Sequence, residues 1–198
     1  GGDMTQGPLT ITVQALGFVP PGKASCRIGA HAGDRIYVTG TLGDAGLALE
    51  TINKGDSLGL TSSQILAVMQ RLNRPEPRVE IGLALRDIAS SAIDISDGLA
   101  ADLGHILSAN QVGAILQLEK LPLSDSLRAL PPERAWQLAL SSGDDYELCF
   151  TLTDDNFAKL PALDVPITRI GTISQTSGLR FSHHGNAKTM NVSGYQHF

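Results

Sequence analysis

The chain is poor in cysteine, in aromatic residues and in positive charge. Two of its 198 residues are cysteines, 5% are aromatic, and 15 lysines and arginines stand against 20 aspartates and glutamates. The net charge of −5 provides no basic stripe for a nucleic-acid backbone, so we expect no nucleic-acid partner. No apolar run approaches the length of a membrane span, and the first residues do not read as a signal peptide, which predicts no membrane association.

The two cysteines, Cys26 and Cys149, lie far apart and lack a metal-ligand spacing such as C-x-x-C. Reduced thiols of this kind fit a cytoplasmic protein, and we take the cytoplasm as the default location. The five histidines show no metal-ligand spacing either, and no Ser-His-Asp arrangement follows from the sequence. Any catalytic chemistry is therefore expected to rest on other residue types.

Hydrophobic residues make up 42% of the chain, which is enough to bury a core, and its length suits one domain or one domain plus a fragment. Two periodicities of the apolar residues alternate along it, one typical of strands and one of helices. The predicted strands are 35–40, 91–95, 114–118, 146–152, 167–173, 179–182 and 187–190, and the predicted helices are 43–53, 61–72, 79–89, 98–109, one from 131 and one near 156. This alternation indicates an α/β fold built of α+β layers.

The first 25 residues read differently from the rest. Residues 1–5 have the composition of a loop, and 9–16 alternate apolar and polar side chains like a half-exposed strand. Pro20, Pro21 and Gly22 then break the pattern, as expected at the end of a domain. We therefore expect a boundary near residue 25, with an α/β domain over 26–198.

The most informative motif is Asp94-Ile95-Ser96-Asp97-Gly98-Leu99, where a buried strand ends and a helix begins. Ligands bind at the carboxyl ends of strands in open α/β sheets. Two carboxylates and a hydroxyl there suit Mg²⁺ with a substrate phosphate. Alternatively, Ser96 or Asp97 caps the helix, although Asp94 interrupts an apolar run and has no such role.

Two further stretches carry candidate chemistry. The run Gly143-Asp144-Asp145-Tyr146-Glu147 places three acids at the entrance to a strand. The simple interpretation, a helix cap at Gly143 followed by solvated acids, explains the glycine and one acid, but three acids around a tyrosine are more than a cap needs. Gly40, Gly43 and Gly46 follow another strand and suit either a phosphate cradle at a helix N-terminus or a tight turn. We favour the turn, because the Gly-Lys-Ser/Thr of a Walker A loop is absent.

In this order the motifs resemble those of the thiamine-monophosphate kinases over essentially the whole chain. The resemblance rests on Gly1-Gly2-Asp3 with Thr5, on the motif 94–99, on 143–150 and on the ending Gly194-Tyr195-x-His197-Phe198. It implies the carboxyl-terminal domain of the aminoimidazole-ribonucleotide-synthase-like fold, with a mixed sheet packed by helices. It also implies that 1–25 are the last loop and strand of an amino-terminal ATP- and Mg²⁺-binding domain. That domain would supply most of a homodimer interface.

The resemblance also implies roles for individual residues. Several Mg²⁺ ions would be held by aspartates, here Asp3, Asp94 and Asp97, and ATP is the expected co-substrate. The residues implied in ATP binding are Gly2, Asp3, Arg27 and Ser96, and those implied in binding thiamine monophosphate are Asp144 and Phe198. Two positions depart from the family pattern: Met4 replaces a threonine, and Asp144 replaces a glutamate that is one methylene longer.

The implied reaction transfers the γ-phosphoryl group of ATP directly to thiamine monophosphate. The acceptor is a phosphate monoester that is already mostly ionised at pH 7, so no catalytic general base is expected. Positioning and charge neutralisation do most of the work in such transfers. We expect the 198 residues alone to be inactive. The alternatives are another ATP-dependent synthase of the superfamily, of the aminoimidazole ribonucleotide or selenophosphate type, and a non-catalytic phosphate- or metal-binding module.

Overall fold

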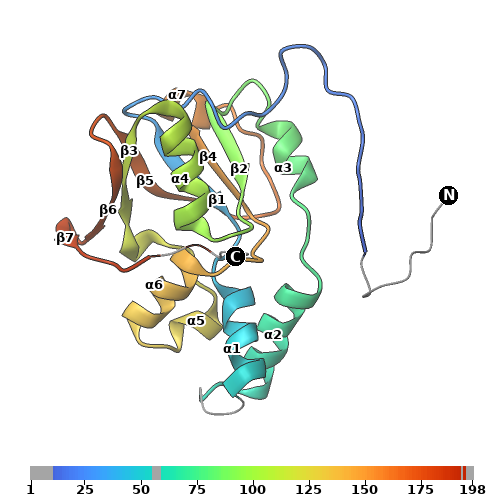
Figure 1. Cartoon of the computed structure of the whole chain (residues 1–198), viewed down its shortest axis with the longest axis vertical. Helices are drawn as coiled ribbons and strands as arrows, with labels where there is room; N and C mark the ends of the chain where they lie inside the picture. The colour runs from blue at the N-terminus through green and yellow to red at the C-terminus, as the bar shows by residue number, and fades with distance from the viewer. Residues whose placement is uncertain (1–10, 55–58, 193, 195–198) are drawn as a thin grey trace.

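The computed structural model describes residues 11–54, 59–192 and 194, and it contains one mixed sheet of seven strands (Figure 1). The order across the sheet is β2-β4-β1-β5-β3-β6-β7, and only the pair β3 and β6 is parallel. The strands are β1 (Arg35–Thr39), β2 (Ser91–Asp94), β3 (Gly113–Gln117), β4 (Leu148–Leu152), β5 (Ile167–Ser174), β6 (Gly178–His183) and β7 (Asn186–Lys188). The predicted α/β class with a mixed sheet is confirmed.

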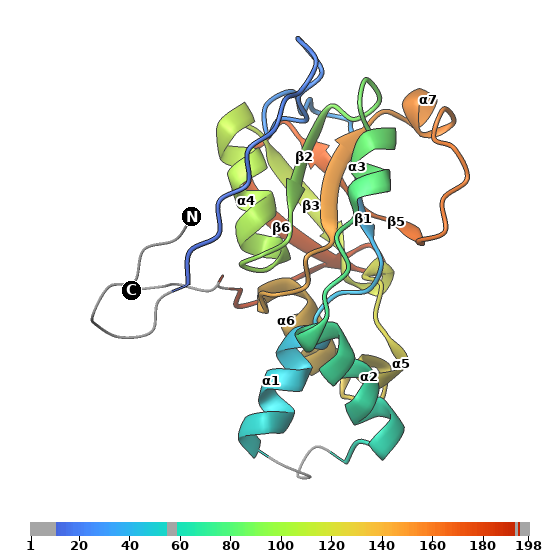
Figure 2. The same cartoon turned by 90° about the vertical axis from the view of Figure 1, so that its right-hand side faces the viewer.

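Five of the helices fall into two groups around this sheet. The α4 helix packs along the sheet, whereas α1, α2, α5 and α6 gather beyond one end of it (Figures 1 and 2). Their bounds are α1 (Asp44–Lys54), α2 (Ser62–Asn73), α3 (Val79–Ala84), α4 (Leu99–Asn110), α5 (Asp125–Arg128), α6 (Pro132–Ser141) and α7 (Asp154–Phe157). A short 3₁₀ turn, η2 (Leu118–Lys120), follows β3. Among the described residues, no helix is long and apolar enough to cross a bilayer.

The core of the described residues forms three clusters. The largest cluster of buried side chains joins α4 to the sheet through residues such as Ile95, Leu103 and Leu116. A second cluster holds the helices at the end of the sheet together, with Leu47 and Leu127 fully buried. A third covers the opposite face of β1 and β4. Apolar burial of this extent is the main stabilising contribution to such a domain.

Two predictions about individual elements are wrong. The segment 11–16 forms no strand; it is extended and exposed, with 79% of Ile11 and 88% of Val13 accessible. A strand needs a neighbour to pair its backbone groups, and no described strand lies beside this segment. The predicted helix 79–89 ends at Ala84, because the chain leaves helical geometry before Asp87, whose φ of 63° is left-handed.

Candidate functional site

Two loops at one end of the sheet are joined by backbone hydrogen bonds. The strands β2 and β4 are antiparallel neighbours, and their ladder continues past the end of β2. The Ile95 amide donates to the Glu147 carbonyl at 2.8 Å, the Tyr146 amide to the Ile95 carbonyl at 2.8 Å, and the Asp144 amide to the Ser96 carbonyl at 2.9 Å. The loop 94–97 and the loop 143–147 therefore form one continuous surface.

Gly143 allows this close approach. A Cβ atom at position 143 would lie 2.5 Å from the Ser96 carbonyl oxygen, which is closer than real Cβ contacts. The glycine was interpreted from the sequence as the end of a helix. In the structure, α6 already ends at Ser141, and Gly143 lets the second loop lie against the first.

Side chains of the loop 143–147 alternate between the interior and the surface. Asp145 and Glu147 are buried, with 3% and 0% exposed, whereas Tyr146 is 40% exposed and Asp144 is half-buried. Asp144 and Tyr146 both have left-handed backbones, with φ of 66° and 50°. Such conformations cost free energy in non-glycine residues and persist only where the surroundings impose them. The simple interpretation of this run as solvated acids is wrong for Asp145 and Glu147.

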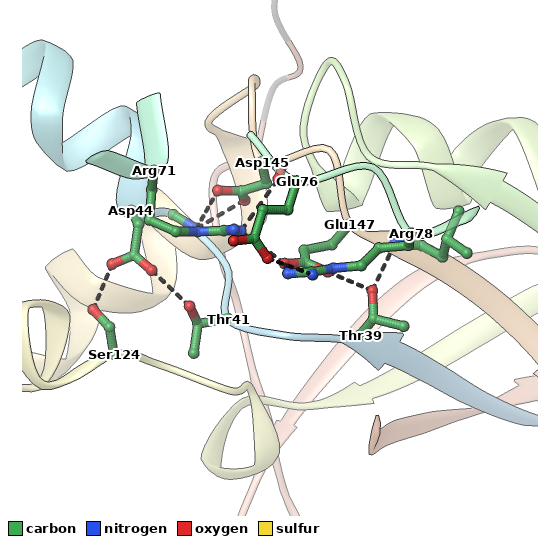
Figure 3. Close-up of polar contacts among 11 residues, drawn as sticks. Thr39, Thr41, Asp44, Arg71, Glu76, Arg78, Ser124, Asp145 and Glu147 are labelled. Atoms are coloured by element: carbon green, nitrogen blue, oxygen red, sulfur yellow. Dashed lines mark hydrogen bonds and ion pairs between the residues drawn. The ribbon is translucent and has the colours of Figure 1, made fainter. Parts of the chain in front are cut away.

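Glu147 is one of the two anchors that impose this conformation (Figure 3). Arg78 donates to both carboxylate oxygens, from Nε and Nη2, at 2.7 Å each, and Arg71 donates from Nη2 at 2.7 Å. The Thr39 hydroxyl donates to Oε2 at 2.5 Å. Burial alone would raise the pKa of the Glu147 carboxyl, but the hydrogen bonds from Arg78 and Thr39 and the two positive charges outweigh it and lower that pKa.

Asp145 is the second anchor, and it contacts the start of α1. Both of its carboxylate oxygens accept the Gly43 amide, at 2.8 and 3.0 Å. Burial raises the pKa of Asp145 to about 8, against the lowering effect of this hydrogen bond. The Gly43 N–H is thus occupied by the protein itself, and a Cβ there would lie 2.7 Å from the Ala139 nitrogen. These contacts support the favoured interpretation of 40–46 as a tight turn.

The loop 94–97 is held by a carboxylate that the sequence analysis did not single out. Asp102, on the first turn of α4 and 3% exposed, accepts the amides of Ser96 and Asp97 through Oδ2 at 3.0 Å each. Burial raises the pKa of Asp102 against these two hydrogen bonds. The signal available in the sequence was an acid on the apolar face of a helix, among Leu99, Leu103 and Ile106.

The helix-cap interpretation of Ser96 and Asp97 is wrong. The N-cap of α4 is Gly98, with φ of 110°, and no side chain caps the helix there. The side chain of Asp94 is exposed, and those of Ser96 and Asp97 are half-buried. Since the backbone of this loop is fixed by Asp102 and by the second loop, its acidic side chains are left for other interactions.

Not every predicted site residue belongs to this pair of loops. Arg27 lies beside the start of β2, because the carbonyl of the preceding residue, Cys26, accepts the Ala92 amide. The carbonyl of Arg27 accepts a hydrogen bond from the side chain of Asn110, at the C-terminal end of α4. The contact of Arg27 with ATP, which the resemblance implies, stays a prediction. Gly2, Asp3 and Phe198, with Met4 and Thr5, lie outside the described residues. Among the residues with described positions, no three His, Cys, Asp or Glu side chains are close enough to hold a metal ion together.

The chain is similar to proteins of known name over its whole length. Residues 31–184 match the family model described as "AIR synthase related protein, C-terminal domain". The thiamine-monophosphate kinase of Escherichia coli K12 is 46% identical over 204 aligned residues, which cover 100% of this chain and 62% of that protein. The chain therefore spans less than two thirds of the length of this relative.

Solved structures give the same result. The crystal structure of thiamine-monophosphate kinase from Stenotrophomonas maltophilia K279a matches with a TM-score of 0.77 and 43% identity, covering 86% of this chain and 56% of that one. A structure described as AaThiL complexed with AMPPCP and TMP matches with a TM-score of 0.70 and 32% identity, covering 88% and 54%.

Proposed function

Because the chain belongs to the AIR synthase related protein, C-terminal domain family, we propose that it is the carboxyl-terminal part of a thiamine-monophosphate kinase. The full-length enzyme would transfer the γ-phosphoryl group of ATP to thiamine monophosphate and form thiamine diphosphate. The observation that carries the proposal is the pairing of two acidic loops. The backbone amide of Asp144 donates to the carbonyl of Ser96, and Ser96 stands between Asp94 and Asp97 in the sequence. Identity of 46% over the whole chain supports the choice of substrate.

In this proposal Asp94 and Asp97 are Mg²⁺ ligands. Their chemistry fits, because Mg²⁺ in phosphoryl-transfer sites takes one or two carboxylates and completes its shell with phosphate oxygens and waters. The described residues offer two such side chains on a loop whose backbone is already fixed, and Asp3 would add a third. When bound, the ions would neutralise the phosphate oxygens of ATP and of the acceptor.

The other residues would bind and orient the two substrates. Ser96, between the two aspartates, would donate to a phosphate oxygen, and Arg27 would approach the nucleotide from the start of β2. Asp144 carries a negative charge next to the metal-binding loop and would attract the cationic thiazolium ring. Phe198 would stack on that ring. No described residue is assigned as a general base, because the acceptor oxygen is already ionised.

We also propose that 1–25 belong with an amino-terminal domain in the full-length enzyme. Val13 and Leu16 are each 88% exposed and Ile11 is 79% exposed, which is an unusual amount of apolar surface for one short segment. Pairing with strands of such a domain would bury these side chains and satisfy the backbone groups of 11–16. The enzyme would form a homodimer through that domain, and the 198 residues alone would be inactive.

The test is a coupled assay of ADP formation by the full-length protein with ATP, Mg²⁺ and thiamine monophosphate. Thiamine diphosphate should appear in equal amount to ADP, and chelation of Mg²⁺ should abolish both. ADP formed only with an aminoimidazole-ribonucleotide precursor, or ATP consumed only with selenide, would instead identify a synthase of the superfamily. Binding of nucleotide without turnover of any of these would identify a non-catalytic module, and either result contradicts the proposal.

A further inference from the structure

Tyr146 lies among the acids of the candidate site, but no role follows for it from the proposed function. Its hydroxyl donates to Asp144 Oδ1 at 3.0 Å. Its backbone amide donates to the Ile95 carbonyl at 2.8 Å, on the loop that carries Asp94 and Asp97. Tyr146 is 40% exposed, so its side chain is accessible at the surface of the two paired acidic loops.

The surrounding structure forces Tyr146 into this position. Its backbone is left-handed with φ of 50°, which is unfavourable for a bulky residue. The buried neighbours Asp145 and Glu147, held by the Gly43 amide and by two arginines, fix the loop on either side. Strained backbone that is imposed by buried anchors is typical of functional sites, where it fixes the direction of a side chain.

The contact with Asp144 has a direct chemical consequence. The phenol hydroxyl satisfies one carboxylate oxygen, so the side chain of Asp144 is oriented while Oδ2 stays available for a ligand. An aromatic ring beside an oriented carboxylate is a suitable surface for a planar cation, which gains both the charge and the face of the ring.

We propose that Tyr146 is a substrate-binding residue, which orients the Asp144 carboxylate through its hydroxyl and presents its ring to a planar cationic heterocycle. This inference rests on the proposed function, which makes that heterocycle the thiazolium of thiamine monophosphate. Tyr146 and Asp144 together then select for the ring of the acceptor, while the loop 94–97 interacts with the phosphates.

The experiment compares Tyr146→Phe with the wild type in the full-length protein. Calorimetry with thiamine, which has the ring but no phosphate, measures ring recognition without turnover. Loss of one hydrogen bond that orients a charged group should weaken thiamine binding by about threefold to tenfold and raise the KM for thiamine monophosphate by the same factor. The KM for ATP, kcat and the unfolding temperature should not change. Tyr37→Phe serves as the control. It removes the hydroxyl of a buried tyrosine on β1 that stacks on Phe150 and Phe157, and it should behave as the wild type.

Two further measurements separate binding from a merely structural role. In an Asp144→Asn background, Tyr146→Phe should have less than half of its effect, because the two residues act together. A neutral analogue, with carbon in place of the thiazolium nitrogen, should bind wild type and Tyr146→Phe equally. Wild-type thiamine affinity in Tyr146→Phe, or an equal loss for the neutral analogue, would overturn the inference. An active enzyme in that case keeps the proposed function, whereas a wild type inactive on thiamine monophosphate overturns both.

Discussion

Replacing Glu147 with glutamine keeps the shape of the side chain but removes its charge from a buried cluster. The carboxylate accepts three hydrogen bonds from guanidinium groups and one from Thr39, and the side chains of Arg78 and Arg71 are only 10% and 22% exposed. Breaking a buried pair costs about 3–5 kcal/mol, because the remaining charges lose their partner. Since two arginines are affected and both keep some solvent, we expect the free energy of unfolding to fall by about 3 kcal/mol.

Urea denaturation of both proteins at pH 7 measures this difference. The pH dependence gives a second check. The folded-state pKa of Glu147 is lowered, so its contribution is fully present above the unfolded carboxyl pKa of about 4.3 and is lost as pH falls through the lower folded value. The difference between variant and wild type should therefore shrink in acid. Glu133→Gln, in an exposed pair with Lys188, should leave stability unchanged. A glutamine variant as stable as the wild type at pH 7 would refute the anchoring role.

Three further predictions concern the same part of the molecule. The folded-state pKa of Asp145 is about 8 and its unfolded value about 3.9, so the contribution of Asp145 to stability declines as pH rises between them. The stability of Asp145→Asn relative to the wild type should therefore increase with pH over this range. A difference in unfolding free energy between the two proteins that is the same at pH 5 and pH 8.5 would contradict this prediction. Gly143→Ala should separate the two loops, because its Cβ would lie 2.5 Å from the Ser96 carbonyl; we expect faster amide exchange at 144 and 146, and unchanged protection would contradict this. Burial raises the pKa of Cys149 to about 12, so a thiol reagent at pH 8 should modify the exposed Cys26 and leave Cys149 intact by peptide mass spectrometry; labelling of both would show that Cys149 is accessible.

Sequence patterns were sufficient to predict most of the fold. The strands β1, β2 and β4 and the helix α4 follow from apolar periodicity, which reflects the face that each element buries. The segment 11–16 has the same periodicity but forms no strand. Periodicity reports which face of a segment can be buried, and it does not report whether a neighbouring strand is present.

The candidate site was predicted in part. Asp94, Ser96, Asp97 and Asp144 were recognisable from local motifs, and the structure brings them together on paired loops. The residues that hold those loops were missed. Glu147 and its partner Arg78 are 69 positions apart, and sequence spacing carries no information about such a contact.

The backbone angles of Tyr146 and Asp144 were also not predicted, because a bulky tyrosine rarely adopts a left-handed conformation and an aspartate adopts it only in a minority of cases. Both angles result from tertiary constraints on a short loop. Local patterns therefore singled out the candidate ligand-binding residues, whose roles stay predictions, and only the structure identified the residues that hold their loops in place.

The most direct test of the central claim measures turnover by Asp94→Asn and Asp97→Asn in the full-length enzyme. Each substitution removes one negative charge from the proposed Mg²⁺ site with little change in shape, and neither side chain is buried. The assay follows ADP and thiamine diphosphate formation over a range of Mg²⁺ concentrations, with Asp155→Asn, an exposed acid on α7, as the control. We predict that each variant loses more than about tenfold in activity, that added Mg²⁺ partly restores it, and that the control matches the wild type. Turnover near the wild-type level in either variant would contradict the claim that this loop binds the metal.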